Sequence, residues 1–140
     1  MIDFVYNTDF RLDNKEIFSR WLISVANDEG FLIDTLVFLF VDDNEILEMN
    51  KKFLKHDYYT DVITFGELED KKISGDIAIS IERVLDNSKT YGVEFEDELK
   101  RVMAHGLLHI MGYDDRKSND KSVMSEKENK AIKMFHVKHI

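Results

Sequence analysis

Four short stretches in the first 80 residues carry hydrophobic patterns that are typical of β-strands. Residues 2–6 alternate apolar and polar side chains, and residues 36–41 form a short apolar run rich in β-branched and aromatic residues. Residues 61–65 and 75–80 have strand character as well, with a charged connector over residues 66–74 between them. The pattern therefore predicts four strands, of which the last two form a hairpin.

Apolar residues at helical spacing predict helices between and after these strands. Asp13 and Glu16 have the spacing of a capping box at the start of the first helix, which residues 28–30 end. The later helices are predicted to begin at residues 42–45 and to occupy residues 81–91, 94–111 and 121–135. Since strands come early and helices gather late, we expect an α+β fold with one mixed sheet of about four strands and helices packed against it.

The 94–111 helix differs from the others in its second half. From Val102 onward it is apolar on nearly every side, which predicts that this half is buried. Gly112 follows as a residue that can end the helix in a left-handed conformation.

The composition limits the class of protein. The 140 residues, 44% of them hydrophobic, are enough for one core, so a single domain over residues 1–140 is expected. The longest purely apolar run has six residues, whereas a membrane span needs about 20, and the first residues lack a signal-peptide pattern. The chain has no cysteine, so any metal site must use histidine and carboxylate ligands. We expect a soluble, cytoplasmic protein.

The charge of the chain opposes non-specific binding of nucleic acid. It has 28 acidic and 19 basic residues, a net charge of −9. Residues 116–140 nevertheless carry seven basic and three acidic side chains, and Lys51, Lys52 and Lys55 form a second basic group. A polyanion would have to contact these two regions, although each is also explained as the solvated face of a helix.

The stretch from His105 to Asp115 carries the clearest chemistry. His105 and His109 are four residues apart on a predicted helix, so both imidazoles lie on one face and can bind one ion. The turn at Gly112 brings Asp114 and Asp115 back toward that face, and either carboxylate could be a third ligand. Three protein ligands leave the fourth position of tetrahedral zinc open, which is the arrangement of catalytic sites.

Two other interpretations of this stretch fit its residues less well. Both histidines could be core residues bonded to the backbone, but unpaired imidazoles on a largely apolar helix cost about 1–3 kcal/mol each, which favours a metal site. A zinc peptidase of the H-E-x-x-H type is excluded, because Gly106 occupies the place of the glutamate base.

Residues 105–115, H-G-L-L-H-I-M-G-Y-D-D, closely resemble the H-G-x-L-H-x-x-G-Y-D-H signature of the YbeY family, the bacterial endoribonuclease and rRNA maturation factors. The segment T-D-V-I-T-F at residues 60–65 is similar to the family's T-D-V-L-S-F. The resemblance extends to residues 75–77 and 124–128, so that the landmarks run in the family's order from about residue 36 to residue 130.

This resemblance implies an α+β metalloprotein with one zinc ion per chain at the end of the long buried helix. It implies a single-strand endoribonuclease that acts in 16S rRNA maturation and ribosome quality control. The implied partners are rRNA and the small ribosomal subunit, with ribosomal proteins or an assembly GTPase as guides, and no membrane.

The resemblance also assigns roles to single residues. His105 and His109 match the first two zinc ligands, and Asp115 stands where the family usually has its third histidine. The family's arginine before T-D-V aligns with Leu54, and Lys55 is the candidate replacement. Asp61 is a further candidate, as a residue that orients a water or bonds to a ligand histidine.

The leading hypothesis is therefore a zinc-dependent endoribonuclease in which metal-activated water attacks a phosphodiester. The sequence shows no obvious general base. The alternatives are a zinc-containing ribosome assembly factor without catalytic activity and a metal-dependent hydrolase of a small substrate.

Overall fold

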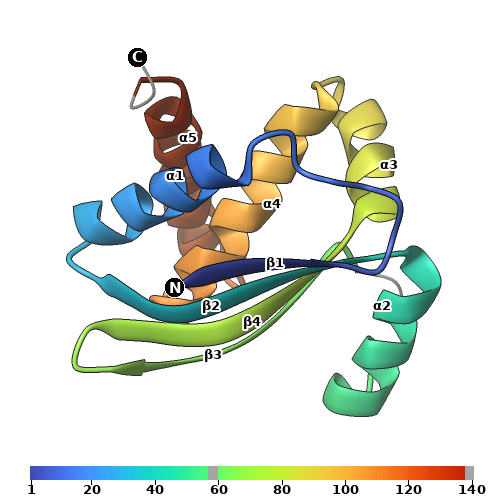
Figure 1. The fold of residues 1–140 in the computed structure, drawn as a ribbon, viewed down its shortest axis with the longest axis horizontal. Helices are drawn as coiled ribbons and strands as arrows, with labels where there is room; N and C mark the ends of the chain where they lie inside the picture. The colour runs from blue at the N-terminus through green and yellow to red at the C-terminus, as the bar shows by residue number, and fades with distance from the viewer. Residues whose placement is uncertain (57–59, 138–140) are drawn as a thin grey trace.

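The computed structural model describes residues 1–56 and 60–137, and these form one sheet with helices against it (Figure 1). The sheet has the strand order β1-β2-β4-β3. The strands are β1 (Ile2–Tyr6), β2 (Leu32–Val41), β3 (Val62–Glu69) and β4 (Lys72–Ser80). β1 pairs parallel to β2 and β2 parallel to β4, whereas β3 is antiparallel to β4. The expected α+β fold with a mixed four-stranded sheet is confirmed.

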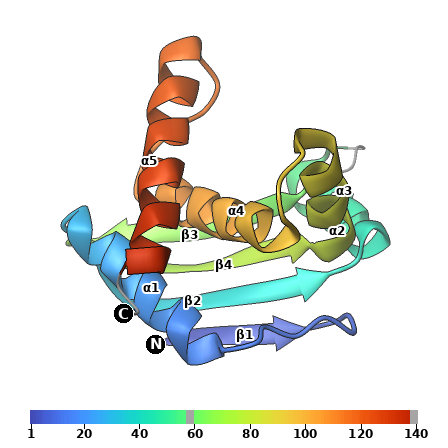
Figure 2. The ribbon, with the colours of Figure 1, turned by 90° about the horizontal axis from the view of Figure 1, so that it is seen from above.

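Most helices cover one face of this sheet, as Figures 1 and 2 show from two directions. These are α1 (Lys15–Asp28), α3 (Ile81–Tyr91), α4 (Phe95–Ile110) and α5 (Ser118–Val137). The core between helices and sheet contains Trp21, Phe38, Ile77 and Leu107, which are fully buried. Trp21 Nε1 donates a hydrogen bond of 2.7 Å to the carbonyl of Ala131, so the core also ties α1 to α5.

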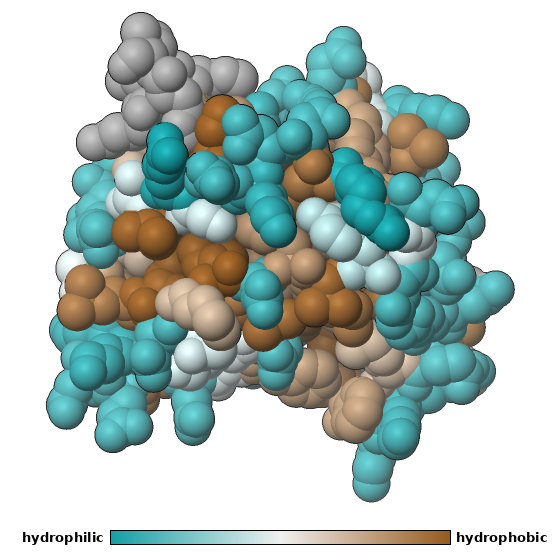
Figure 3. All heavy atoms as spheres, in the orientation of Figure 1, coloured by the Kyte–Doolittle hydropathy of each residue, from teal (hydrophilic) through white to brown (hydrophobic). Residues whose placement is uncertain are grey.

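The opposite face of the sheet is covered at one end by α2 (Asp43–Met49), which a π-helical turn, η1 (Asn50–Leu54), continues. A smaller apolar cluster of Val41, Ile46, Ile63 and Ala78 holds them there. In Figure 3 hydrophobic side chains gather in a band across the middle of the molecule, at the level of the sheet, with hydrophilic side chains above and below. The molecule is therefore not uniformly polar on this side.

Several element boundaries differ from those that the sequence predicts: β2 begins at Leu32 rather than at residue 36, and α5 begins at Ser118 rather than at residue 121. The charged connector expected over residues 66–74 is mostly strand, because β3 and β4 stay paired as far as Glu69 and Lys72. Only Asp70 and Lys71 form the turn, with φ of 50° and 68°, the left-handed values that a tight two-residue hairpin requires. Backbone pairing does not need apolar side chains, so an exposed polar hairpin has no hydrophobic signal. The first helix is capped by Asn14, which accepts a hydrogen bond from Ile17 N, and not by Asp13.

Helix α4 packs close to the sheet because Gly106 on the helix and Gly66 on β3 have no side chains at the contact. A Cβ on Gly106 would lie 2.9 Å from Cγ2 of Ile77 and 3.3 Å from Oγ1 of Thr64. On β3, a Cβ on Gly66 would lie 2.6 Å from Ile110 Cγ1. Because glycine has no side chain, α4, which carries His105 and His109, lies directly against β3 and β4.

Within the part of the chain that the structure describes, every helix is too short or too polar to cross a lipid bilayer.

Candidate metal centre

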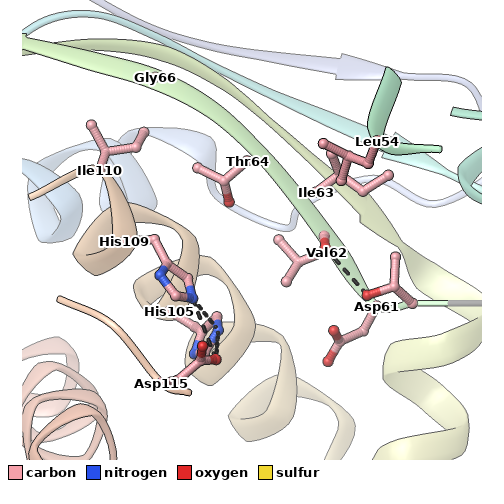
Figure 4. Close-up of a pocket in the computed structure, with 11 residues that line it drawn as sticks. Leu54, Asp61, Val62, Ile63, Thr64, Gly66, His105, His109, Ile110 and Asp115 are labelled. Carbon is pink, nitrogen blue, oxygen red and sulfur yellow. Dashed lines mark hydrogen bonds and ion pairs between the residues drawn. The ribbon is translucent and has the colours of Figure 1, made fainter. Parts of the chain in front are cut away.

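Three side chains converge at the end of α4. His105 Nε2 lies 3.0 Å from His109 Nε2, and Asp115 Oδ2 lies 3.2 Å from the former and 3.4 Å from the latter. Figure 4 shows the two rings and the carboxylate pointing toward one another. Ligand atoms at 2.0–2.1 Å from a tetrahedral zinc ion lie roughly 3.3 Å from each other, so the three atoms have the separation that such an ion requires. The group could hold a metal ion.

The local sequence explains why the three side chains meet. His105 and His109 are one helical turn apart on α4, which ends at Ile110. Gly112 then takes a φ of +109°. Gly112 N donates to the carbonyl of His109 and Tyr113 N to that of Leu108, the two bonds of a Schellman motif. This motif reverses the chain and returns residues 114 and 115 to the histidine face.

The sequence leaves open which of two aspartates is the third potential ligand, and the structure places Asp115 beside the histidines. His105, His109 and Asp115 together form the metal group. Asp114 is instead turned toward Arg116, whose Nε and Nη2 donate to its Oδ2 at 2.9 and 2.7 Å. The Arg116 guanidinium, aided by the backbone amide of Asp115, lowers the pKa of Asp114 to about 2. Asp114 therefore has its own partner, and the carboxylate of Asp115 is left to face the two imidazoles.

The three side chains lie at the edge of a cavity of about 490 Å³ between α4 and β3. The cavity is lined also by Leu54, Asp61 and Thr64, which Figure 4 places across from the histidines. Its volume is within the range of small-ligand sites in proteins. A molecule bound here would contact the three side chains and β3 at the same time.

The two candidate catalytic residues occupy different places. Asp61 lines the cavity, and burial raises its pKa more than the attraction of Arg101 lowers it. Asn87 Nδ2 donates to its Oδ2 at 3.2 Å. Lys55 has a left-handed φ of 58° and an exposed side chain, and it is not among the described residues that line the cavity. Its neighbour Leu54 lines the cavity instead.

Sequence reasoning missed a set of buried charges behind the histidines. Glu128 on α5 is 5% exposed, and its Oε2 lies 2.5 Å from Nδ1 of His105. Glu98 and Arg101 lie on α4, and the carboxylate of Glu98 is bonded to the guanidinium of Arg101. Glu128 belongs to the segment of residues 124–128 that resembles the family, which was the available signal, but its contact with His105 joins residues far apart in the chain.

Together, the fold and the site define a class of protein: an α+β domain with a two-histidine, one-aspartate metal group beside a cavity at the sheet. A sequence model of the family described as Endoribonuclease YbeY matches residues 5–136. The chain belongs to this family, as its signature predicts.

Relatives and a solved structure agree with this assignment. A protein from Flavobacterium johnsoniae named Endoribonuclease YbeY is 45% identical over 98% of this chain and 99% of its own length. A protein of the same name from Karelsulcia muelleri is 46% identical over 99% of this chain and 96% of its own. The solution structure of TM1509 from Thermotoga maritima superposes with a TM-score of 0.67 at 27% identity, covering 96% of this chain and 89% of that one.

Proposed function

We propose that this chain is a zinc-dependent endoribonuclease that acts in the maturation of 16S rRNA and in ribosome quality control. The observation that carries the proposal is the convergence of His105, His109 and Asp115 at the edge of a cavity. The names of the relatives, which describe endoribonucleases, support the reaction class. One zinc ion per chain would fit the one group of three potential ligands found among the described residues.

His105, His109 and Asp115 would hold the ion through two neutral nitrogens and one anionic oxygen. A zinc ion in such a site supplies Lewis acidity toward a phosphate oxygen and a nucleophile from water at neutral pH. An anionic ligand reduces the positive charge that the site presents, so water there is less acidic than with three histidines. Another side chain in the cavity would therefore have to take up or release protons during the reaction.

Asp61 is the candidate for that task. It lies in the same cavity as the metal group, and its raised pKa brings the carboxyl group closer to neutral pH. An acid or base works best when its pKa is near the working pH. Asp61 would then orient water in the cavity or exchange a proton with the reacting groups.

Binding of RNA would depend on a few basic regions. The overall charge of −9 opposes approach of a polyanion, whereas residues 116–140 carry an excess of basic side chains. Lys55 would contact phosphate from outside the cavity, as a point charge without the paired donors of arginine. Weak intrinsic affinity is consistent with delivery to the small subunit by ribosomal proteins or an assembly GTPase, in the cytoplasm.

The test compares the wild type with His109→Ala, purified in parallel, on precursor 16S rRNA. We expect zinc content and cleavage to fall together, cleavage by more than about 100-fold, which exceeds the usual effect of changing a residue that supports a ligand. Wild type stripped with a chelator and then reloaded with zinc is the control and should recover. A contaminating ribonuclease would appear equally in both preparations.

One observation favours a second function, a zinc-containing ribosome assembly factor that cuts nothing. Leu54 lines the cavity where the family has an arginine, so a phosphate in the cavity would meet an apolar side chain there. If wild type and His109→Ala cleave equally, or neither cleaves, the assembly factor replaces the nuclease as the explanation. Rescue of ribosome maturation by a folded His105 variant would agree with that result.

A further inference from the structure

The second ring nitrogen of His105 has a partner of its own. Nε2 belongs to the metal group, 3.0 Å from His109 Nε2 and 3.2 Å from Asp115 Oδ2. Nδ1, on the other side of the ring, lies 2.5 Å from Glu128 Oε2. An ionised carboxylate can only accept, so the contact fits a hydrogen bond donated by Nδ1–H to ionised Glu128. It leaves the lone pair on Nε2, where the metal group needs it.

Glu128 is itself held in place. It comes from α5, across the interface with α4, and is 5% exposed. Its other oxygen, Oε1, lies 3.5 Å from Nη1 of Arg101. A buried carboxylate is costly unless it is paired and bonded, and Glu128 has one partner for each oxygen. The two contacts together restrict the direction from which Glu128 approaches the imidazole.

Arg101 is positioned by a further pair of bonds. Its Nε and Nη2 donate to the two oxygens of Glu98 at 2.9 and 2.5 Å, a bidentate pair. Nη2 also lies 3.7 Å from Asp61 Oδ2. Arg101 is one helical turn before His105 on α4, so guanidinium and imidazole share a face of the helix. The contacts form a continuous series from the cavity wall at Asp61 to the back of His105.

The charges in this series favour a cation at the metal group. Three carboxylates, those of Glu98, Glu128 and Asp61, surround the one guanidinium of Arg101. Asp115 adds a fourth carboxylate on the other side of His105. A partly buried site with this excess of negative charge is stabilised by a divalent cation. A purely structural ion pair between Arg101 and Glu98 would not require Glu128 to contact His105.

We infer that Glu128 is a positioning residue for the metal group, which sets the tautomer and orientation of His105 through Nδ1. The inference rests on the proposed metal site but not on the cleavage of RNA. Carboxylates that bond to a ligand histidine in this way raise its basicity and hold its ring, and their loss typically weakens metal affinity by about 10–100-fold.

The first experiment measures zinc affinity by competition with a chromophoric chelator for wild type, Glu128→Ala and Glu128→Gln. We expect Glu128→Ala to bind zinc about 10–100-fold more weakly. Glu128→Gln should lie between, because its amide oxygen still accepts from Nδ1–H but has no charge. Glu126→Ala is the matched control, since it removes an exposed carboxylate from the same helix and should bind zinc as wild type does.

The second experiment reads the tautomer directly by ¹H–¹⁵N NMR of the imidazole nitrogens in the zinc-free protein at pH 8, above the ordinary imidazole pKa of about 6.5. We expect the His105 proton on Nδ1 in wild type and Glu128→Gln, and a shift toward Nε2 in Glu128→Ala. A structural role in packing alone would not move this signal. The backbone amide spectrum of each variant reports whether it is folded.

Two results would overturn the inference: wild-type His105 with its proton on Nε2, or unchanged zinc affinity in folded Glu128→Ala. If Glu128→Ala does not fold, the zinc affinity of Glu128→Gln and the tautomer of His105 in the wild type still test the inference. The proposed function fails separately, if zinc-loaded wild type leaves precursor rRNA uncut while the Glu128 results hold.

Discussion

Asp115 determines the character of the metal group more than either histidine does. Its carboxylate reaches Nε2 of both rings at 3.2 and 3.4 Å, although it occupies the position of a histidine in the family signature. Carboxylate oxygen binds zinc at about 2.0–2.2 Å, so the shorter side chain is an acceptable replacement. The exchange makes the ligand set anionic.

The role of Asp115 can be tested against its neighbour. Asp115→Ala should lower zinc affinity by more than about 10-fold, since a direct ligand is lost rather than a residue that supports one. Asp114→Ala should leave zinc affinity unchanged, because Asp114 pairs with Arg116. Competition with a chelator measures both. The opposite ranking of the two variants would show that Asp114 is the ligand.

At the scale of elements, the site depends on how closely α4 approaches the sheet. Gly106 lies between the two histidines and faces Ile77, which is fully buried on β4. Glycine inside a helix usually costs stability relative to alanine. Here it permits a contact that places the histidines beside β3, so the local cost serves the position of the site.

Gly106→Ala should lower the free energy of unfolding despite the better helix propensity of alanine. The new Cβ would lie 2.9 Å from Cγ2 of Ile77, and overpacking of a core costs about 1–3 kcal/mol, whereas the propensity gain is about 1 kcal/mol. Urea denaturation of the metal-free protein measures the change.

Ile77→Ala provides the control for this prediction, because it removes both Ile77 atoms that the new Cβ would meet. In that background only the 3.3 Å approach to Thr64 Oγ1 remains, so Gly106→Ala should destabilise less and the two substitutions are non-additive. A Gly106→Ala protein more stable than wild type would show that α4 can move away from the sheet at no cost.

For the molecule as a whole, the metal group links α4 to the loop that follows it, and Glu128 extends that link to α5. The chain has no disulfide that could hold these elements together. The acidic character of the whole chain, with a net charge of −9, also favours uptake of a cation. Metal binding and folding stability are therefore expected to be coupled.

Zinc should stabilise the wild type by mass action. With free zinc at 100 times its dissociation constant, the free energy of unfolding should rise by about 2.7 kcal/mol, and a chelator should remove the gain. Denaturant titrations with zinc and with chelator measure the difference. His109→Ala should show little response to either addition. A wild type that is equally stable in both would contradict binding at this site.

The parts of the site that could be predicted are those whose residues lie close together in the sequence. His105 and His109 are four residues apart, and the turn at Gly112 is local, so helical geometry and glycine chemistry were enough to bring the histidines and an aspartate together. Helices α3 and α4 and strand β1 also follow from hydrophobic periodicity, as observed. The hairpin of β3 and β4 was predicted, but not its length, because the pairing of its polar residues beyond Phe65 depends on backbone bonds.

The sequence by itself determined the family, the fold class and the histidine pair, since these depend on residue types at short, regular spacings. Only the tertiary structure placed Asp115 beside both imidazoles and Asp114 against Arg116, put Leu54 rather than Lys55 in the cavity wall, and joined Glu128 to His105. For the charged side chains the physical reason is the same. A charged side chain takes the partner that packing brings within reach, here 23 residues away for Glu128 and His105, and no local pattern records that choice.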